Sequence, residues 1–213
     1  MKRMCSLIIS IFLSILMVSR IYASTGIDVS SYQGLINWKE VAEDNITFAF
    51  IRCKSAVTGV DTMFDYNMSN AIENKIPVGV YYYSGATTDD EIVKETTYIL
   101  SVVKPYKVTL PLVLDIEGPY QATLTKERLQ RNIEIFSKLV KDAGYTPMIY
   151  SNTNFYKNHL GTVSTLKWEA NYGNKQPNAT YWQYTSRGKI KGIEGYVDLN
   201  KSLKHTISCN IVN

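Results

Sequence analysis

The chain has 213 residues and a formal net charge of +4, but the positive charge is unevenly distributed. The first 23 residues contain Lys2, Arg3 and Arg20 and no acid, so removing those three charges leaves +1 for the rest. No Lys/Arg cluster or basic helix face follows, which argues against a nucleic-acid-binding protein. The remaining stretch of about 190 residues suits one domain with a substantial core.

The N-terminal segment is typical of a secretory signal peptide. Its basic start is followed by an apolar run over residues 5–18 and by the small residues Ala23 and Ser24. That order predicts a signal peptide, and the run is shorter than the about 20 apolar residues of a membrane span. We expect residues 1–23 to be removed and residues 24–213 to form one domain. The mature protein would be secreted, extracellular or in a lysosome-like compartment, and free of the membrane; an uncleaved anchor is the alternative.

Five short apolar strands alternate with helical segments after this leader. The longest helix has one apolar stripe, and Gly144 should end it. Another helix begins among Thr and Asp residues, which suit a helix N-terminus. In chain order we expect strands at 25–29, 47–52, 77–83, 110–116 and 147–151, followed in turn by helices at 37–44, 63–74, 88–103, 124–143 and 155–160.

Three further strands, at 166–171, 180–184 and 196–199, follow without helices between them. Five β/α units and three bare strands make eight strands, and an alternating β/α order favours parallel strands. Eight such strands close naturally into a barrel. The sequence therefore predicts an α/β fold, a modified TIM-like (β/α) barrel of five β/α units followed by three strands.

Two carboxylates end the fourth of these strands. Asp115 and Glu117 are two residues apart, so their side chains face the same way. Burial and like charge would leave a protonated acid beside an ionised carboxylate. Cleavage of a glycosidic bond needs such a pair, one member to protonate the leaving oxygen and one to stabilise or attack the anomeric carbon. Two solvated acids at a strand end are the alternative. A metal site is disfavoured, because His159 and His205 have no ligand spacing.

Two more acids should lie close to this pair. Asp28 ends the first strand and Asp198 lies in the last, and these two strands are neighbours in a closed barrel. All four acids should then meet at one rim, where the catalytic groups of such barrels are found. Either Asp alone could instead cap a turn.

Aromatic residues at the expected strand ends suit a carbohydrate ligand. Flat rings stack on the apolar faces of pyranose rings, and their hydroxyl and indole groups bind sugar hydroxyls. Many of the 16 Tyr residues should instead lie in the core. The candidate substrate-binding residues are Tyr81, Tyr150 and Trp182.

Cysteine usage is consistent with export. Cys53 and Cys209 remain once the leader is removed, and an oxidising compartment would permit one disulfide between them. Two unrelated thiols are the alternative. Four Asn-x-Ser/Thr sequons, which are glycosylated only in a eukaryotic secretory route, begin at Asn45, Asn67, Asn178 and Asn200.

Short motifs along the chain occur in one order. They are GIDVSSYQG at 26–34, FIR at 50–52, GVY at 79–81, LVLDIE at 112–117, MIYS at 148–151, WEANY at 168–172, WQY at 182–184 and GYVDLN at 195–200. The set resembles the glycoside hydrolase family 25 lysozymes, the Chalaropsis-type N-acetylmuramidases. The resemblance covers residues 25–200, and its first, fourth and last motifs are specific in combination.

The resemblance implies hydrolysis, without a cofactor, of the β-1,4 bond between N-acetylmuramic acid and N-acetylglucosamine in bacterial peptidoglycan. The sequence does not indicate an oligomeric state, and a monomer is the default expectation. By matching position Glu117 would be the general acid/base and Asp115 the second catalytic carboxylate, while Asp28 and Asp198 would line and tune the site. Cα atoms two apart on a strand are separated by about 6.5–7 Å. That spacing does not decide whether Asp115 attacks directly or assists the substrate's own acetamido group.

Departures from the family pattern spare the four acids. Asn37 stands where an Asp is usual, Cys53-Lys54 where small residues are common, and Tyr82 where a His is frequent. Two rival readings are a barrel that binds cell-wall or chitin glycans without cutting them and a chitinase-like hydrolase. The first would usually have lost an acid, and the second would need an Asp in the place of Val113.

Overall fold

A computed structural model describes residues 24–173 and 178–203. Their strands form one nine-stranded sheet in the order β1-β9-β8-β7-β6-β5-β4-β2-β3, and an additional β1–β2 pairing closes eight of them into a barrel. The short β3 (Gly59–Val60) lies outside the barrel and pairs with the end of β2. The expected signal peptide and Cys209 fall outside the described residues. Within those residues, no helix is long and apolar enough to cross a lipid bilayer.

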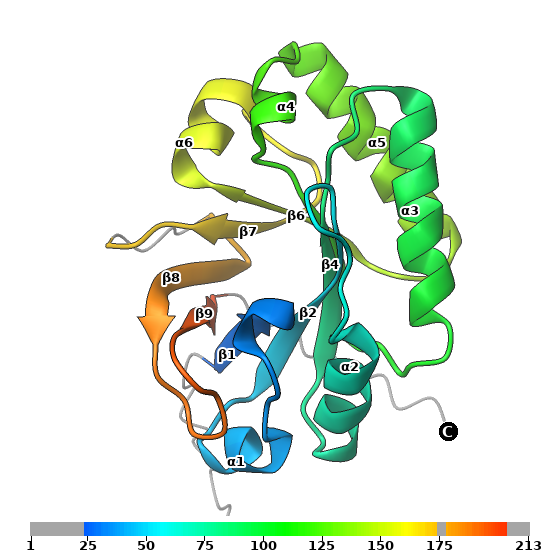
Figure 1. Cartoon of the computed structure of the whole chain (residues 1–213). Helices are drawn as coiled ribbons and strands as arrows, with labels where there is room; N and C mark the ends of the chain where they lie inside the picture. Colours follow the sequence, from blue (N-terminus) through cyan, green and yellow to red (C-terminus); the bar gives the residue numbers. More distant parts are fainter. Residues whose placement is uncertain (1–23, 174–177, 204–213) are drawn as a thin grey trace, which may run out of the picture.

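Five β/α units and three further strands build the barrel, which confirms the predicted architecture (Figure 1). The units are β1 (Thr25–Val29) with α1 (Trp38–Glu43), β2 (Phe48–Ser55) with α2 (Phe64–Glu73), β4 (Val78–Tyr83) with α3 (Asp89–Val103), β5 (Leu112–Asp115) with α5 (Lys126–Asp142), and β6 (Pro147–Asn152) with α6 (Thr153–Phe155) and the π-helix η2 (Tyr156–Leu160). The bare strands are β7 (Leu166–Ala170), β8 (Tyr181–Gly188) and β9 (Val197–Ser202).

The last strand runs against the others, and here the expectation of parallel strands was wrong. β9 is antiparallel to both of its neighbours, β8 and β1. Only residues 189–196 join β8 to β9, and a parallel neighbour would need a crossover of a dozen or more residues. The chain therefore turns straight back, with Gly192 and Gly195 at positive φ in the connection.

Side chains alternate between the inside of the barrel and the layer under the helices. Inside, aromatic rings fill the space, and Phe50 stacks on Trp168 with 4.6 Å between ring centroids. Gly79 makes room for Phe50, because a Cβ there would lie 2.4 Å from the ring. Leu114 and Ile116 point the other way, into the core shared with the helices. The barrel is thus packed along most of its length, and space for a ligand is left at one end.

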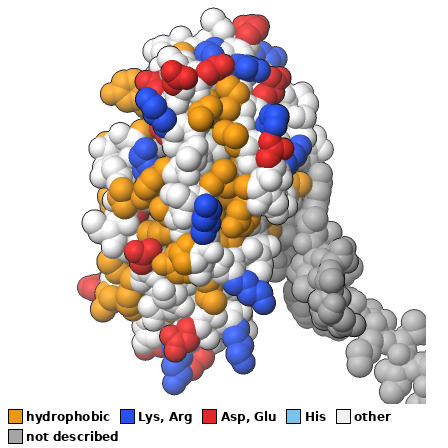
Figure 2. All heavy atoms as spheres, turned by 90° about the vertical axis from the view of Figure 1, so that its right-hand side faces the viewer, with side chains coloured by type: hydrophobic (Ala, Val, Ile, Leu, Met, Phe, Trp, Pro, Cys, Tyr) orange, Lys and Arg blue, Asp and Glu red, His pale blue; other side chains and the backbone are white. Residues whose placement is uncertain are grey.

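The helices form as their sequence signals predict. Thr88 and Glu91 make a reciprocal capping box at the start of α3. The apolar stripe of α5 is buried, and Gly144 follows the helix at φ +84°. Figure 2 shows the face that carries α3, where hydrophobic side chains gather in the middle and charged side chains of both signs surround them.

The predicted disulfide and the predicted glycosylation sites both involve residues that the structure buries. Cys53 is fully buried, and its pairing with Cys209 stays a prediction. The sequon residues Asn67 and Asn200 are also fully buried. The folded protein cannot accept a glycan at those two positions, whatever its secretory route.

Candidate active site

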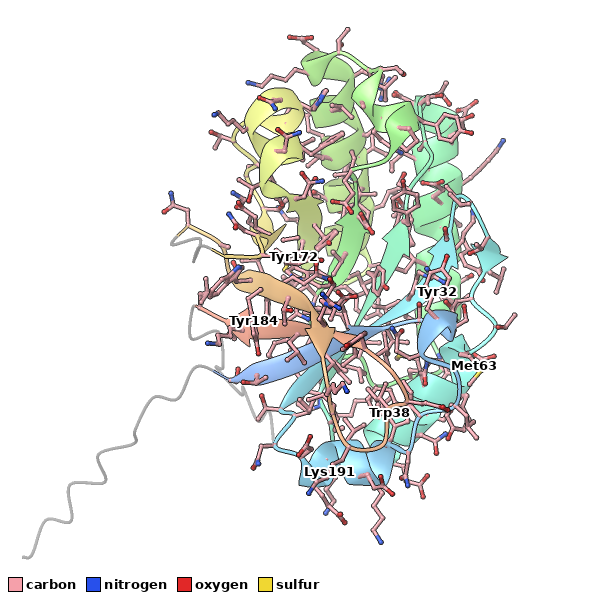
Figure 3. The ribbon with its side chains drawn as sticks, turned by 60° about the vertical axis from the view of Figure 1, so that its left-hand side comes forward. Tyr32, Trp38, Met63, Tyr172, Tyr184 and Lys191 are labelled. Atoms are coloured by element: carbon pink, nitrogen blue, oxygen red, sulfur yellow. The ribbon has the colours of Figure 1, made fainter. Side chains whose placement is uncertain are left out.

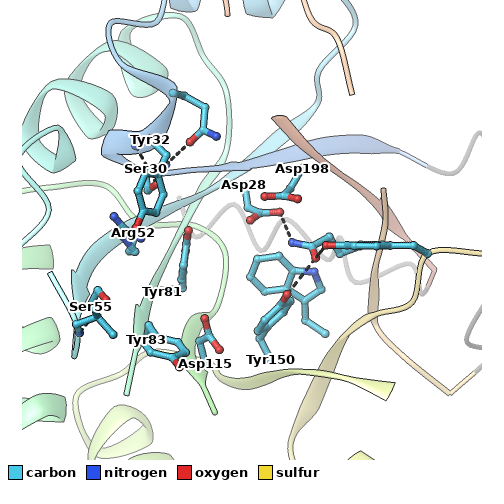
Figure 4. A pocket seen from close by; sticks show the side chains of 15 residues that line it. Asp28, Ser30, Tyr32, Arg52, Ser55, Tyr81, Tyr83, Asp115, Tyr150 and Asp198 are labelled. Atoms are coloured by element: carbon cyan, nitrogen blue, oxygen red, sulfur yellow. Dashed lines mark hydrogen bonds between the residues drawn. The ribbon is translucent and has the colours of Figure 1, made fainter. Parts of the chain in front are cut away.

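A pocket of about 350 Å³ opens where the parallel strands of the barrel end (Figure 4). Asp28, Asp115 and Asp198 all line it. Glu117 lines a second pocket of about 190 Å³ that shares Tyr150 and Tyr172 with the first. The structure thus brings the four expected acids to two adjoining pockets, which together are called the cleft below.

Asp28 and Asp198 face each other across the β1–β9 pair. They are direct partners in the antiparallel register, so Asp198 reaches the rim from the start of its strand and not from its end. Burial raises the pKa of Asp28 to about 8, with a further contribution from the charge of Asp198, and burial raises the pKa of Asp198 to about 6. Near neutral pH this pair therefore holds a proton that isolated carboxyl groups would have lost.

Asp115 is the last residue of β5 and is almost completely buried. Burial, followed by the charges of Glu117 and Asp28, raises its pKa well above the usual range. Its Oδ1 has no hydrogen-bond partner among the described residues. A buried polar atom without a partner needs an explanation, and in a cleft a ligand group can supply the missing bond.

Glu117 follows two residues later, on the same side of the chain. Its Oε2 accepts hydrogen bonds from the backbone N of Asn152 at 2.9 Å and from the Nδ2 of the same residue at 2.8 Å. Burial raises the pKa of Glu117, and the two bonds from Asn152 partly offset that rise. Asp115 is more buried and receives no such bonds, so its ionised form is stabilised less than that of Glu117.

Gln183 is a site residue that the sequence reasoning missed. Its Oε1 accepts hydrogen bonds from the hydroxyls of Tyr150 at 3.0 Å and Tyr172 at 2.9 Å, and its Nε2 donates to Asp28 at 2.9 Å. The two bonds to Oε1 fix the orientation of the amide group. Strand alternation could have found Gln183, since it lies two residues after the inward Tyr181.

Asn200 donates a second hydrogen bond to the carboxylate oxygen of Asp28 that Gln183 contacts. Its Nδ2 donates to Asp28 Oδ2 at 2.7 Å, while its Oδ1 accepts from the indole of Trp168 at 2.8 Å. Asn200 belongs to the GYVDLN motif and begins a sequon, but neither pattern predicts a role in the site. It lies two residues after Asp198, on the same face of β9.

Arg52 lines one wall of the cleft, although no sequence pattern predicted a role for it. Its Nη2 pairs with Asp61 at 2.8 Å and donates to the Ser31 hydroxyl at 3.2 Å. The ring of Tyr32, on the short helix η1 (Ser31–Gln33), lies 4.8 Å from the guanidinium carbon and is 75% exposed. Tyr32 and Tyr172 both border the mouth of the cleft (Figure 3). Exposed rings in this position can stack on sugar faces.

The three expected substrate-binding aromatics divide into two groups. Tyr81 and Tyr150 line the cleft. Trp182 does not, because alternation along β8 turns it outward when its neighbour Gln183 points in. It packs on the outer face beside Tyr184, with 5.5 Å between ring centroids, and its indole donates to Asn171 O at 2.8 Å. The expectation that Trp182 borders this cleft is therefore wrong.

No group of three or more His, Cys, Asp or Glu side chains in residues 24–173 and 178–203 is arranged to hold a metal ion. The cleft offers carboxyl, amide and hydroxyl groups together with aromatic rings. These are the groups that bind and protonate sugars.

A closed α/β barrel with a carboxyl-lined cleft at one end is an architecture found among glycosidases. Residues 27–193 match the model of glycosyl hydrolases family 25. The chain belongs to this family.

Relatives include the uncharacterized protein YegX of Escherichia coli K12, which is 32% identical over 192 residues, or 84% of this chain and 69% of YegX. Lysozyme M1 of Streptomyces globisporus is 28% identical over 197 residues, or 83% of this chain and 66% of that protein. A solved family 25 glycosyl hydrolase from Bacillus anthracis is 28% identical with a TM-score of 0.76, covering 87% of this chain and 91% of that one.

Proposed function

We propose that the protein is a peptidoglycan hydrolase, a lysozyme that cleaves the β-1,4 bond between N-acetylmuramic acid and N-acetylglucosamine. The observation that carries this proposal is the placement of Asp115 and Glu117 side by side on the cleft, with Asp28 and Asp198 across the same rim. The similarity to proteins named lysozymes supports the choice of substrate.

Glu117 serves as the proton donor in this proposal. Its proton passes to the glycosidic oxygen as the bond from that oxygen to the anomeric carbon breaks, and a water that later attacks the sugar returns a proton to Glu117. Asp115, whose pKa is also raised, competes for that proton. An N–H or O–H of the sugar that donates to the unpartnered Oδ1 of Asp115 would stabilise its ionised form, which moves the proton to Glu117.

Asp115 acts on the anomeric centre, either by direct attack or by orienting the substrate's acetamido group. Its burial suits both, because a carboxylate in a low-dielectric site stabilises developing positive charge more strongly than one in water. Asp28 and Asp198 line the opposite side of the cleft and hold an oriented sugar through their carboxyl groups, of which that of Asp28 is fixed by Gln183 and Asn200. Tyr81 and Tyr32 offer ring faces at the edge.

The same proposal includes export. The basic, apolar and small-residue order of residues 1–23 supports a cleaved signal peptide and a secreted enzyme. Sequencing the N-terminus of the protein recovered from culture medium tests this. A first residue of Ser24 supports export with cleavage after Ala23, and a product that stays in the cells with Met1 intact contradicts it.

Incubation with purified peptidoglycan and, separately, with chitin tests the enzymatic proposal. Mass analysis of the soluble products should find fragments with new reducing ends on N-acetylmuramic acid and none released from chitin. Release from chitin alone would favour a chitinase-like hydrolase. Binding to peptidoglycan without any released fragment would show a non-catalytic glycan-binding barrel.

A further inference from the structure

A second cavity lies immediately beside the cleft, on the outer side of the barrel rim. It has a volume of about 600 Å³ and is called the rim pocket here; its walls include Lys54, Ser55, Gly59, Lys94, Glu95 and Tyr120. These residues come from β2, β3, α3 and the four-residue helix α4 (Pro119–Ala122). Apart from Ser55, none of these residues lines the cleft.

Ser55 joins the rim pocket to the cleft, since it lines both. It pairs with Tyr83 at the ends of β2 and β4, and the Ala56 N–H donates to Tyr83 O at 2.9 Å. Tyr83 lines the cleft, whereas Ala56 lines the rim pocket. A branch attached to a sugar in the cleft can therefore enter the rim pocket by crossing Ser55.

The acids of the rim pocket are occupied by the protein itself. Glu95 accepts from the Ser84 hydroxyl and from Gly85 N at 3.1 Å. Glu91 accepts from Thr87 N at 2.7 Å and Thr88 N at 3.1 Å as part of the cap of α3. Both carboxylates stabilise the connection from β4 to α3, so they offer little to a ligand.

The cations of the rim pocket are not occupied in this way. In the described part of the chain neither Lys54 nor Lys94 has a carboxylate within ion-pair distance. The Nζ of Lys54 lies 5.5 Å from the centroid of the Tyr98 ring, and Lys94 is exposed. Two unpaired ammonium groups beside an exposed Tyr120 ring suit a flexible ligand that carries carboxylates.

We infer that the rim pocket binds the acidic peptide branch of the wall glycan while the sugar chain occupies the cleft. This inference rests on the proposed function. Peptidoglycan carries short peptides with free carboxyl groups on its muramic acid residues, and the shared Ser55 gives such a branch a path from the cleft.

The test compares two substrates made from one preparation: peptidoglycan with its peptides, and the same glycan strands after an amidase has removed them. A Lys54→Ala/Lys94→Ala variant should show a KM about fivefold to tenfold higher on the peptide-bearing substrate, with kcat unchanged. On the stripped glycan its KM should equal that of the wild type. The matched control is Lys104→Ala/Lys107→Ala, which removes two exposed charges from the connection between α3 and β5 and should change neither substrate.

Each outcome separates the inference from the proposed function. If the wild-type protein cleaves neither substrate, the proposed function itself fails. If it cleaves both and the Lys54/Lys94 variant loses affinity equally for both, or for neither, the rim pocket does not bind the peptide. Added salt should shrink the difference between the variant and the wild type, because the contacts are between charges near the surface.

Discussion

At the scale of single residues, the main feature of the cleft is that its four acids bind protons more tightly than free carboxyl groups do. Asp28, Asp115, Asp198 and Glu117 all have raised pKa values, and burial is the first cause for each. The protein adds hydrogen-bond donors selectively: Glu117 receives two and Asp115 Oδ1 receives none. That contrast distinguishes Asp115, the last residue of β5, from Glu117, two residues beyond it; strand alternation alone treats the two acids as equivalent.

The bonds from Asn152 to Glu117 should show in the pH dependence of activity. Asn152→Ser keeps an oxygen that can cap α6, where the Asn152 Oδ1 now accepts from Phe155 N at 2.9 Å. It keeps the backbone N–H donor to Glu117 but removes the Nδ2 donor. The pKa of Glu117 should rise, so the alkaline limb of the pH–rate profile should move upward by about one pH unit. Rates on soluble peptidoglycan fragments between pH 4 and pH 10 measure this. An unmoved alkaline limb would show that Glu117 does not set it.

Asp28 should make stability fall as pH rises. Its pKa is 3.8 as a free group and about 8 in the fold, so between these values the native state binds a proton that the unfolded chain lacks. The contribution of Asp28 to the free energy of unfolding therefore decreases from about pH 4 to about pH 8. In Asp28→Asn, whose side-chain oxygen can still accept from Gln183 and Asn200, the decrease should be smaller by roughly 1–3 kcal/mol. Urea unfolding of the wild type and of Asp28→Asn at pH 5 and pH 8 measures this decrease. An equal decrease in the free energy of unfolding of both proteins would contradict the raised pKa of Asp28.

At the scale of elements, sequence reasoning worked where one local signal decides. The sequence predicted the apolar stripe of α5, the N-terminal cap of α3 at Thr88 and the end of α5 at Gly144. Each of these depends on residues within one or two helical turns. The two-residue β3 and the four-residue α4 were missed, since elements this short have no periodicity. β5 was expected to begin at residue 110, but it begins after Pro111, which lacks the N–H that a central strand needs.

The packing of β4 against β2 inside the barrel depends on a glycine. A Cβ at Gly79 would lie 2.4 Å from the Phe50 ring and 2.7 Å from the Pro111 carbonyl oxygen, and the second neighbour is backbone. Gly79→Ala should lower the free energy of unfolding by about 1–3 kcal/mol. This exceeds the about 0.4–1 kcal/mol usually gained when a glycine in a compatible conformation becomes alanine. Urea unfolding measures it, with Lys107→Ala as an exposed control; a stabilised Gly79→Ala protein would refute the close packing.

At the scale of the whole molecule, counting strands predicted a closed barrel but not the direction of its last strand. The direction of β9 decides why Asp198 is at the rim, because in a parallel strand a residue so near the start would lie at the opposite end. Gln183, Asn200 and Arg52 escaped notice for a related reason. Strand alternation indicates that Gln183 points inward, but Asp28 lies 155 residues from Gln183 and 172 residues from Asn200, so the closed fold is needed to show that both hold it. The closed fold also shows that Arg52 lines the cleft.

The central claim is that this barrel end is a muramidase site in which Glu117 donates the proton. The rate at which reducing ends appear in purified peptidoglycan, compared between the wild type and Glu117→Gln, tests it most directly. The variant should keep the circular dichroism spectrum and unfolding midpoint of the wild type and lose at least about 100-fold in rate. Glu134→Gln, an exposed change on α5, should leave the rate unchanged. A folded Glu117→Gln protein that releases muramic acid reducing ends at the wild-type rate would contradict the account.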